Sequence, residues 1–410
     1  MGSADFGREL RRRRLERKLN LREFAMLVHY SKGYLSKIEN GRRPPSESLR
    51  RVCDDALSAG GELVEFASPQ PDRDQDLGPD TALAIELHPD GSGTIRIGES
   101  HMRAATVLPS MAIGSAEVLT CLGSIFDYTR HLGRISSPSI VLPMVVMQYH
   151  AASATAEQRT GRQRRELLLH SAHTAEFAGW MAQECGDDRG ALQWTDLAVR
   201  RAGDAGDRHM TSYALVRRAM VSLYSGDSSA TTTLAETVLA DDAVHPRIRW
   251  LAALGAAQGY AMASDHKGSM RALDTAAGLH DAAHRSTDGQ QLGPSTLHER
   301  PALIEAWCQY DLGNLDDAAV LFDQAMSENP EQSDRARARF GTRRALVYAA
   351  LGEPNQACAL IEPLLDVIRS VDSETIRIDL REFIDTMGRY RGLSALRDIQ
   401  PALDSALSGR

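Results

Sequence analysis

Residues 19–41 read LNLREFAMLVHYSKGYLSKIENG and contain the starts of two helices and the end of one. Asn20 and Glu23 form a capping-box pattern, in which the asparagine side chain caps the helix start and the glutamate reaches back to it. A short helix is therefore expected through Phe24, Ala25 and Val28. Another helix is expected over residues 32–40, since Ser31 can cap its start and the following Gly41 is a typical terminator.

Helices are also expected on both sides of this stretch. Phe6, Leu10 and Leu15 recur near helical spacing in a segment rich in arginine, which predicts a first helix over about residues 5–18. A fourth helix and a last short turn are expected after Pro45. Their apolar positions are Leu49, Val52, Leu57, Leu63 and Phe66. Residues 1–67 are thus predicted to form a small helical domain.

Charge is distributed unevenly along the chain. Residues 1–51 contain 14 Lys and Arg and 6 Asp and Glu, a net charge of +8, whereas residues 52–410 contain 33 and 49, a net charge of −16. A compact basic segment on an acidic body is expected where that segment binds a polyanion, because phosphate neutralisation supplies most of the sequence-independent binding energy. A solvated charged surface would explain the charge alone equally well.

The apolar, capping and glycine positions of residues 19–41, followed by Arg-Arg-Pro, resemble the Cro and phage-repressor type of helix-turn-helix domain over about residues 5–67. The resemblance implies that the third helix enters the major groove of DNA and that the loop after it contacts phosphates. The implied base contacts are Lys32, Gly33, Ser36 and Lys37, and the implied phosphate contacts are Asn40, Arg42 and Arg43. The resemblance also implies an internal ion pair between Arg14 and Glu39.

Some of these residues have a second interpretation. Lys32 and Lys37 suit the acceptors of guanine, but lysines on a surface helix also serve solubility. Gly33 has no side chain at a position where the family usually has a base-contacting residue. This favours close approach of the backbone to DNA, or weak discrimination between bases at that position. Tyr34 could stack at the DNA surface or close the small core.

Residues 68–80 and 81–164 separate this domain from the rest of the chain. The first segment is acidic and lacks apolar periodicity, which predicts a flexible linker. In the second segment, apolar residues alternate on both sides of a glycine-rich turn, which predicts a β-hairpin within residues 83–97. The apolar stretch 101–150 is expected to form buried helices that break near Pro109 and Pro138.

Residues 165–410 are predicted to form consecutive amphipathic helices. Turn residues recur at Gly186, Gly226, near Asp265, at Gly313 and at Gly352, which indicates stacked helix pairs. The spacing of small residues around Phe322 resembles the second helix of a tetratricopeptide repeat. The predicted fold class is therefore mostly α, with an N-terminal helix-turn-helix domain, a small β-hairpin and a tetratricopeptide-like helical repeat array.

The sequence favours a binding protein over an enzyme. It contains no phosphate-binding loop, His-Glu-x-x-His motif or nucleophile elbow, and we expect no catalytic residue, metal site or cofactor. His170 and His173 are expected to be packing or surface residues. The five widely spaced cysteines are expected to be reduced core residues. Without an apolar run of about 20 residues or a signal peptide, a cytoplasmic location is expected and a membrane partner is not.

A Cro-type head on a tetratricopeptide-like body resembles transcriptional regulators of actinomycetes and, more distantly, the peptide-pheromone receptors of Gram-positive bacteria. The resemblance implies a homodimer that binds a double-stranded DNA operator and senses a small-molecule or peptide effector. An arginine and aromatic lining of the array would suit an acidic or planar ligand, although aromatic residues at helical spacing more often belong to a core. The candidate pocket residues are Tyr213, Arg217, Arg249, Trp250, Trp307 and Tyr310.

Two other functions fit the same sequence. The array could bind only a partner protein, with the head still reading DNA. Alternatively, the chain could be a helical-repeat scaffold whose basic head binds nucleic acid without sequence preference.

Overall fold

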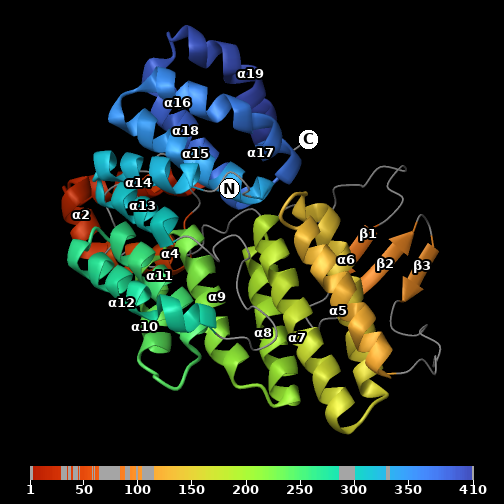
Figure 1. Ribbon diagram of the computed structural model, residues 1–410. Coiled ribbons are helices and arrows are strands. Elements are labelled where there is room, and N and C mark those ends of the chain that lie inside the picture. The colour runs from red at the N-terminus through yellow and green to blue at the C-terminus, as the bar shows by residue number, and fades with distance from the viewer. Residues whose placement is uncertain are drawn as a thin grey trace.

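The structure is a computed structural model of the chain, and its described part is mainly helical (Figure 1). The described residues are 3–28, 35, 38–39, 45, 47–57, 59, 61–63, 84–87, 93–97, 100–103, 115–285, 301–328 and 333–408. The predicted linker over residues 68–80 lies outside this set.

Three helices of the amino-terminal domain are described, namely α1 (Ser3–Glu16), α2 (Leu21–Val28) and α4 (Glu47–Leu57). The capping box is present: the Asn20 amide donates to Glu23 Oε2 over 2.8 Å, and the Glu23 amide donates to Asn20 Oδ1 over 3.0 Å. The two helices that the sequence predicted on either side of the central stretch therefore exist, and the cap at the start of α2 is formed as expected.

The core of this domain is small and fully apolar at its centre. Its buried members are Phe6, Leu10, Phe24, Ala25, Val28, Leu35, Ile38, Leu49, Cys53, Leu57, Ala59 and Leu63. The prediction is wrong at two apolar positions, because the side chains of Leu15 and Val52 are exposed. The stripe of α1 continues from Phe6 and Leu10 to position 14, four residues on, and position 15 is turned about 100° away from it.

A three-stranded antiparallel sheet lies between the two helical parts in the sequence. Its strands are β1 (Ala84–Leu87), β2 (Gly93–Ile97) and β3 (Ser100–Arg103). Ile85 is paired with Ile95 across the β1–β2 ladder, and Ile95 is paired with Met102 across the β2–β3 ladder. β1 and β2 lie where the alternating pattern predicted a hairpin, and β3 was not predicted.

The remaining described residues form a right-to-left succession of helices in Figure 1, ending in a separate upper group of C-terminal helices. These helices are α5 (Ser115–Leu132), α6 (Pro138–Glu157), α7 (Gly161–Glu184), α8 (Asp188–Ala205), α9 (His209–Ser225), α10 (Ser228–Leu239), α11 (Pro246–Met262), α12 (His266–Arg285), α13 (Pro301–Leu312), α14 (Leu315–Ser327), α15 (Asp334–Leu351), α16 (Pro354–Ile361), α17 (Leu365–Val371), α18 (Glu374–Met387) and α19 (Ser394–Ser408).

Six turns join successive helices of the array with one shared geometry. Each contains a residue with positive φ, namely Gly186 at 85°, Gly206 at 79°, Gly226 at 79°, Ser264 at 62°, Gly313 at 87° and Gly352 at 88°. The next amide then bonds to a carbonyl five residues back, as in the 2.9 Å bond from Asp187 N to Ala182 O. This is the Schellman ending of a helix, which favours glycine. The predicted turn alignment is therefore confirmed, and at the degenerate turn before Asp265 a serine adopts the conformation.

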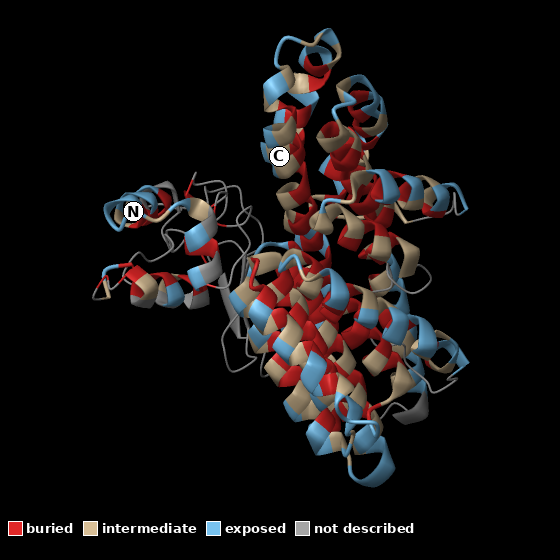
Figure 2. Ribbon diagram, turned by 90° about the vertical axis from the view of Figure 1, so that its left-hand side faces the viewer, coloured by how far each residue is buried: buried red, intermediate tan, exposed pale blue. Residues whose placement is uncertain are grey.

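The helical array has two large apolar cores that meet at α15, and a small third cluster of Ala156, Leu167 and Leu168. The larger core extends from Phe126 to Val347, and the smaller one from Ala338 to Ala406. Phe340 of α15 belongs to the first core and Leu346 to the second. Figure 2 shows the buried positions as continuous stripes inside the stacked helices. α15 is thus the element through which the two parts of the array are packed together.

The surface of α5 and α6 departs from the expectation of wholly buried helices. Among the described residues, eleven large apolar side chains are exposed, and six of them lie between positions 125 and 147: Ile125, Tyr128, Ile135, Ile140, Met144 and Met147. Cys121 and Cys185 are also exposed, so the expectation that all five cysteines are core residues is wrong. None of the described helices is long and apolar enough to cross a membrane.

Candidate nucleic-acid interface and ligand cavity

A buried ion pair joins α1 to Glu39, which lies in the segment where the third helix is predicted. Arg14 Nε donates to Glu39 Oε1 over 2.5 Å, and Arg14 Nη2 donates to Glu39 Oε2 over 2.7 Å. Arg14 Nη1 also donates to the Leu19 carbonyl over 2.7 Å. Because a bidentate guanidinium–carboxylate pair fixes both distance and orientation, it holds the segment around Glu39 against α1 and the start of α2. The implied Arg14–Glu39 pair is therefore present.

Gly7 brings α1 into direct backbone contact with the same segment. A Cβ atom at position 7 would lie 2.2 Å from the Ile38 carbonyl oxygen and 2.9 Å from the Glu39 carbonyl oxygen. Any larger residue would therefore have to push the two backbones apart. Together with the Arg14–Glu39 pair, this close approach sets the position of the segment that carries the predicted DNA-reading residues.

We expect Gly7→Ala to weaken both the stability and the DNA binding of the domain. Overpacking of this kind typically costs about 1–3 kcal/mol, and here the obstacle is backbone rather than a flexible side chain. The matched control is Gly278→Ala on α12, where an added Cβ meets no atom within 4 Å. Hydrogen exchange of α1 amides measures the effect. Equal protection in Gly7→Ala and the parent chain would contradict the assigned contact.

The predicted DNA contacts lie outside the described residues. This applies to Lys32, Gly33, Ser36 and Lys37 and to Asn40, Arg42 and Arg43. Their assignment therefore remains a prediction from the sequence. The described neighbours Leu35, Ile38 and Glu39 are buried, which is the placement that the predicted third helix requires for its inner face.

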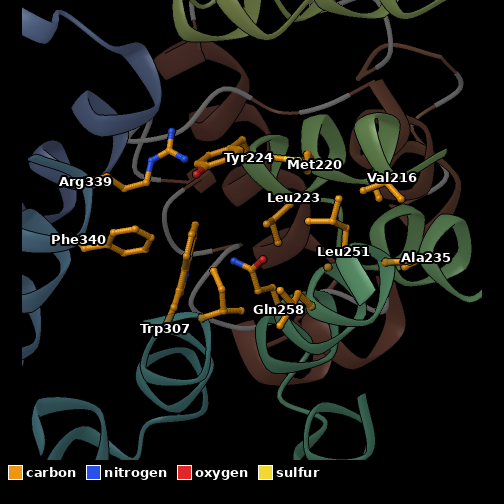
Figure 3. Close-up of a pocket in the computed structure, with 15 residues that line it drawn as sticks. Val216, Met220, Leu223, Tyr224, Ala235, Leu251, Gln258, Trp307, Arg339 and Phe340 are labelled. Atoms are coloured by element: carbon orange, nitrogen blue, oxygen red, sulfur yellow. The ribbon is translucent and has the colours of Figure 1, made fainter. Parts of the chain in front are cut away.

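The array contains a small cavity, of about 30 Å³, between α9, α10, α11, α13 and α15 (Figure 3). Most of its wall is apolar. Leu223 and Leu251 face Trp307 and Phe340 across it, and Gln258 and Arg339 are the polar side chains with nitrogen donors at its edge. The volume is sufficient for about two water-sized groups.

The six candidate pocket residues do not come together at this cavity. Trp307 lines it, but the other five have different surroundings. Tyr213 and Arg217 are fully buried beside α7, where the Tyr213 hydroxyl donates to Glu176 over 2.8 Å and Arg217 Nη2 donates to Gln183 over 3.2 Å. Both therefore belong to the packing between α7 and α9.

The remaining candidates are also used elsewhere. Trp250 is fully buried with its ring 5.1 Å from that of His284. Arg249 pairs with Asp242 over 2.6 Å, and the Tyr310 hydroxyl donates to Glu382 over 3.1 Å. Of the six residues predicted to face a ligand pocket, only Trp307 lines the cavity. Neighbouring helices in a stacked array cover most aromatic positions.

A second group of arginines, which the sequence analysis did not select, lies beside the cavity. Arg335, Arg339 and Arg343 occur at four-residue spacing on α15 and are buried, and we call them the arginine ladder. Arg335 Nη1 and Arg339 Nη2 donate to the two oxygens of Glu184 over 2.7 and 2.8 Å. Arg343 makes a bidentate pair with Asp379 at 2.9 and 2.7 Å.

The ladder connects segments that are far apart in the sequence. Arg335 also donates to the Gly133 and Ser136 carbonyls over 2.7 Å each, between α5 and α6. Glu184 accepts further bonds from Ser373 and Thr375 at the start of α18. The C-terminal helices are thus attached to α7 and to the α5–α6 turn by buried polar contacts. The signal was the Arg-x-x-x-Arg-x-x-x-Arg spacing, which places three cations on one helix face.

Aromatic side chains pack against Arg339 and Arg343 of the arginine ladder. The Arg343 guanidinium lies 3.1 Å from the centroid of Trp307, and that of Arg339 lies 5.5 Å from the centroid of Tyr224. Tyr224 and Trp307 both line the cavity. Such cation–π contacts are worth more when the cation is desolvated, as it is here.

The histidines and carboxylates of the described residues do not gather in one place. Within the described part of the chain, no group of three or more His, Cys, Asp or Glu side chains could hold a metal ion. His170 is buried with its ring 5.6 Å from that of Phe126, and burial lowers its pKa. It is therefore a packing residue of α7.

The comparisons with known proteins locate one domain. Residues 5–67 match the family model described as a helix-turn-helix domain. No curated protein matches the chain. Among solved structures, a Rap protein complexed with competence and sporulation factor is 11% identical and has a TM-score of 0.42, with 72% of this chain and all of that chain covered.

Proposed function

We propose that this chain is a sequence-specific DNA-binding transcriptional regulator whose helical array controls its helix-turn-helix domain. The observation that carries the proposal is the helix-turn-helix match over residues 5–67, which includes most of the +8 segment, residues 1–51, of an otherwise acidic chain. Such a domain places a helix in the major groove and uses basic residues around it for phosphates. A helix-turn-helix domain on a repeat scaffold favours a regulator over an enzyme.

The reading residues in this proposal are Lys32, Gly33, Ser36 and Lys37, with Asn40, Arg42 and Arg43 on phosphates. Genome-wide mapping of sites bound by the full chain would supply a test sequence. On that sequence, Lys37→Ala should cost about 1–3 kcal/mol and relax the preference at one base pair, because lysine donates to guanine acceptors.

Two further variants separate base reading from charge. Arg42→Ala should weaken all duplexes alike and reduce the salt dependence by about one released counterion, since a phosphate contact carries no sequence information. Lys267→Ala removes the same charge from an exposed position of α12 and should not change DNA affinity. Unchanged affinity and specificity in Lys37→Ala would disprove its assignment.

The proposal includes a homodimer. One small head reads only a few base pairs, so two heads are needed to select a genomic site. The exposed face of α5 and α6 supports a contact between two copies, because Ile140, Met144 and Met147 form one stripe on a helix with no charged residue before Glu157. Clustered exposed apolar residues of this kind mark interaction surfaces. Sedimentation tests this contact by comparing the oligomeric state of Met144→Glu with that of the parent chain, which should be the dimer.

The proposal also includes an effector bound by the array. The cavity, with its two polar side chains and apolar wall, supports this role, as does its position beside the ladder that joins α7, α15 and α18. An effector can change DNA binding only through its differential affinity for two arrangements, typically about 1–3 kcal/mol of coupling.

A further inference from the structure

Three buried guanidinium groups beside the cavity share two carboxylates. Arg335, Arg339 and Arg343 are 0%, 3% and 9% exposed, and the carboxylates that pair with them, Glu184 and Asp379, are each 1% exposed. Arg335 and Arg339 share the single carboxylate of Glu184, and Arg343 pairs with Asp379. Two buried guanidinium groups that share one carboxylate can accommodate a further anion beside them.

Arg339 is the arginine of the ladder that lines the cavity. Its Nη2 donates to Glu184 and Thr375, but its Nε has no hydrogen-bond partner although the residue is almost completely buried. Gln258, which is 6% exposed, has an Nε2 without a partner. Both side chains line the same cavity, and in Figure 3 the Gln258 amide nitrogen is turned toward the Trp307 side.

The rest of the wall determines the character of a ligand. Leu223, Leu251 and Ile304 are aliphatic, and Trp307 and Phe340 are aromatic. Pockets for small organic molecules combine such an apolar wall with a few polar groups that orient the ligand. The two unpaired donors can satisfy an acceptor, and a guanidinium donor bonds more strongly to an ionised acceptor than to a neutral one.

We propose that this cavity binds a small organic carboxylate, whose oxygens accept from Arg339 Nε and Gln258 Nε2 and whose apolar part contacts Trp307, Phe340 and Leu251. The volume of about 30 Å³ holds the two carboxylate oxygens. The apolar part requires the wall to yield, and Met220 is the unbranched apolar side chain of that wall. The proposal rests on the proposed function only for its consequence, which is that the bound acid is the signal of the array.

The test uses the full chain with butyrate, hexanoate and benzoate, and with butanamide, hexanamide and benzamide as uncharged matches. Isothermal titration should detect binding of at least one acid, with its amide bound tenfold or more weakly, because the charge-assisted bonds are lost. Gln258→Leu keeps the shape of the wall and removes one donor, so it should weaken the acid about tenfold or more while the amide changes little.

A blocking variant keeps the test independent of the ladder. Gly255 lines the cavity, and a Cβ added there meets no atom within 4 Å, so Gly255→Leu should fold and fill the space. Gly278→Leu on α12, which also has open space, is the control. The acid should bind Gly278→Leu and not Gly255→Leu. Absence of acid binding to the parent chain, equal binding of acid and amide, or equal binding to both glycine variants would overturn the inference.

DNA affinity is measured in the same samples to separate this inference from the proposed function. Acid binding that shifts DNA affinity supports both the cavity assignment and the proposed regulator function. DNA binding without any acid binding overturns only the cavity assignment. Acid binding by a chain that binds no DNA upholds the site and contradicts the regulator.

Discussion

Replacing Glu184 with glutamine should lower the free energy of unfolding of the array by about 3–5 kcal/mol. Glu184 is the shared acceptor of Arg335 and Arg339, and the exposure of these three side chains is no more than 4%. The desolvation cost of the two guanidinium groups would remain after the substitution, while the carboxylate that offsets it would be gone. The loss is therefore much larger than the worth of a surface pair.

The matched control lies on the same helix. Glu166 pairs with Arg162 on the exposed side of α7, so Glu166→Gln should cost less than about 1 kcal/mol. All four tryptophans, Trp180, Trp194, Trp250 and Trp307, are in the array, so their fluorescence in urea reports on this part of the chain alone. Similar urea midpoints for the two variants would show that the ladder does not hold the array together.

Glu184 also makes the stability of the array depend on pH. Burial by itself would raise the pKa of Glu184, but Arg339, Arg335 and the hydroxyls of Ser373 and Thr375 lower it from 4.5 to about 2. The folded pKa lies below the unfolded one, so the stabilisation is complete above about pH 4.5 and is lost as the pH falls toward 2. Burial raises the pKa of Asp379, which acts in the opposite direction. Glu184→Gln should therefore lose less stability than the parent chain between pH 4.5 and 2.

Breaking the Arg14–Glu39 pair should abolish DNA binding by the full chain. Glu39→Gln leaves a buried guanidinium without its carboxylate, at a cost of about 3–5 kcal/mol. A domain of about 60 residues has a total stability of only about 3–9 kcal/mol, so most of it would be lost. Glu16→Gln, which removes an exposed partner of Arg12 on α1, should leave binding intact.

A double substitution distinguishes structural support from DNA contact. Replacing both partners with apolar residues of similar volume is often neutral or stabilising, so Arg14→Met with Glu39→Leu should restore the fold and most of the DNA affinity. Hydrogen exchange of α1 and α2 amides reports the fold, and anisotropy of a labelled duplex reports the affinity. A folded double variant that still fails to bind would mean that Arg14 or Glu39 contacts DNA directly.

Local signals in the sequence were sufficient where the backbone itself requires particular residues. The capping box at Asn20 and Glu23 and the turn glycines at 186, 226, 313 and 352 each fix a conformation through one or two side chains. Ser264 shows the limit of this approach, since a serine adopts positive φ in the place where the other turns have glycine.

The side-chain environment of the array could not be predicted in the same way. Tyr213, Arg217 and Trp250 have the helical spacing of a groove lining, yet neighbouring helices cover them. Which face of a repeat helix remains open depends on contacts between residues 150 or more positions apart, such as that of Arg335 with Glu184. The sequence shows the arginine spacing on α15, but not the carboxylate that it meets.

The central claim, that the helix-turn-helix domain makes this chain a reader of specific duplex DNA, is tested most directly by selection from a random duplex pool with the full chain at physiological salt. The account predicts enrichment of a sequence with two half-sites about 10 base pairs or a multiple of that distance apart, bound at least 10³-fold more tightly than the unselected pool. Recovery of no common sequence, with equal affinity for the selected and unselected DNA, would contradict it.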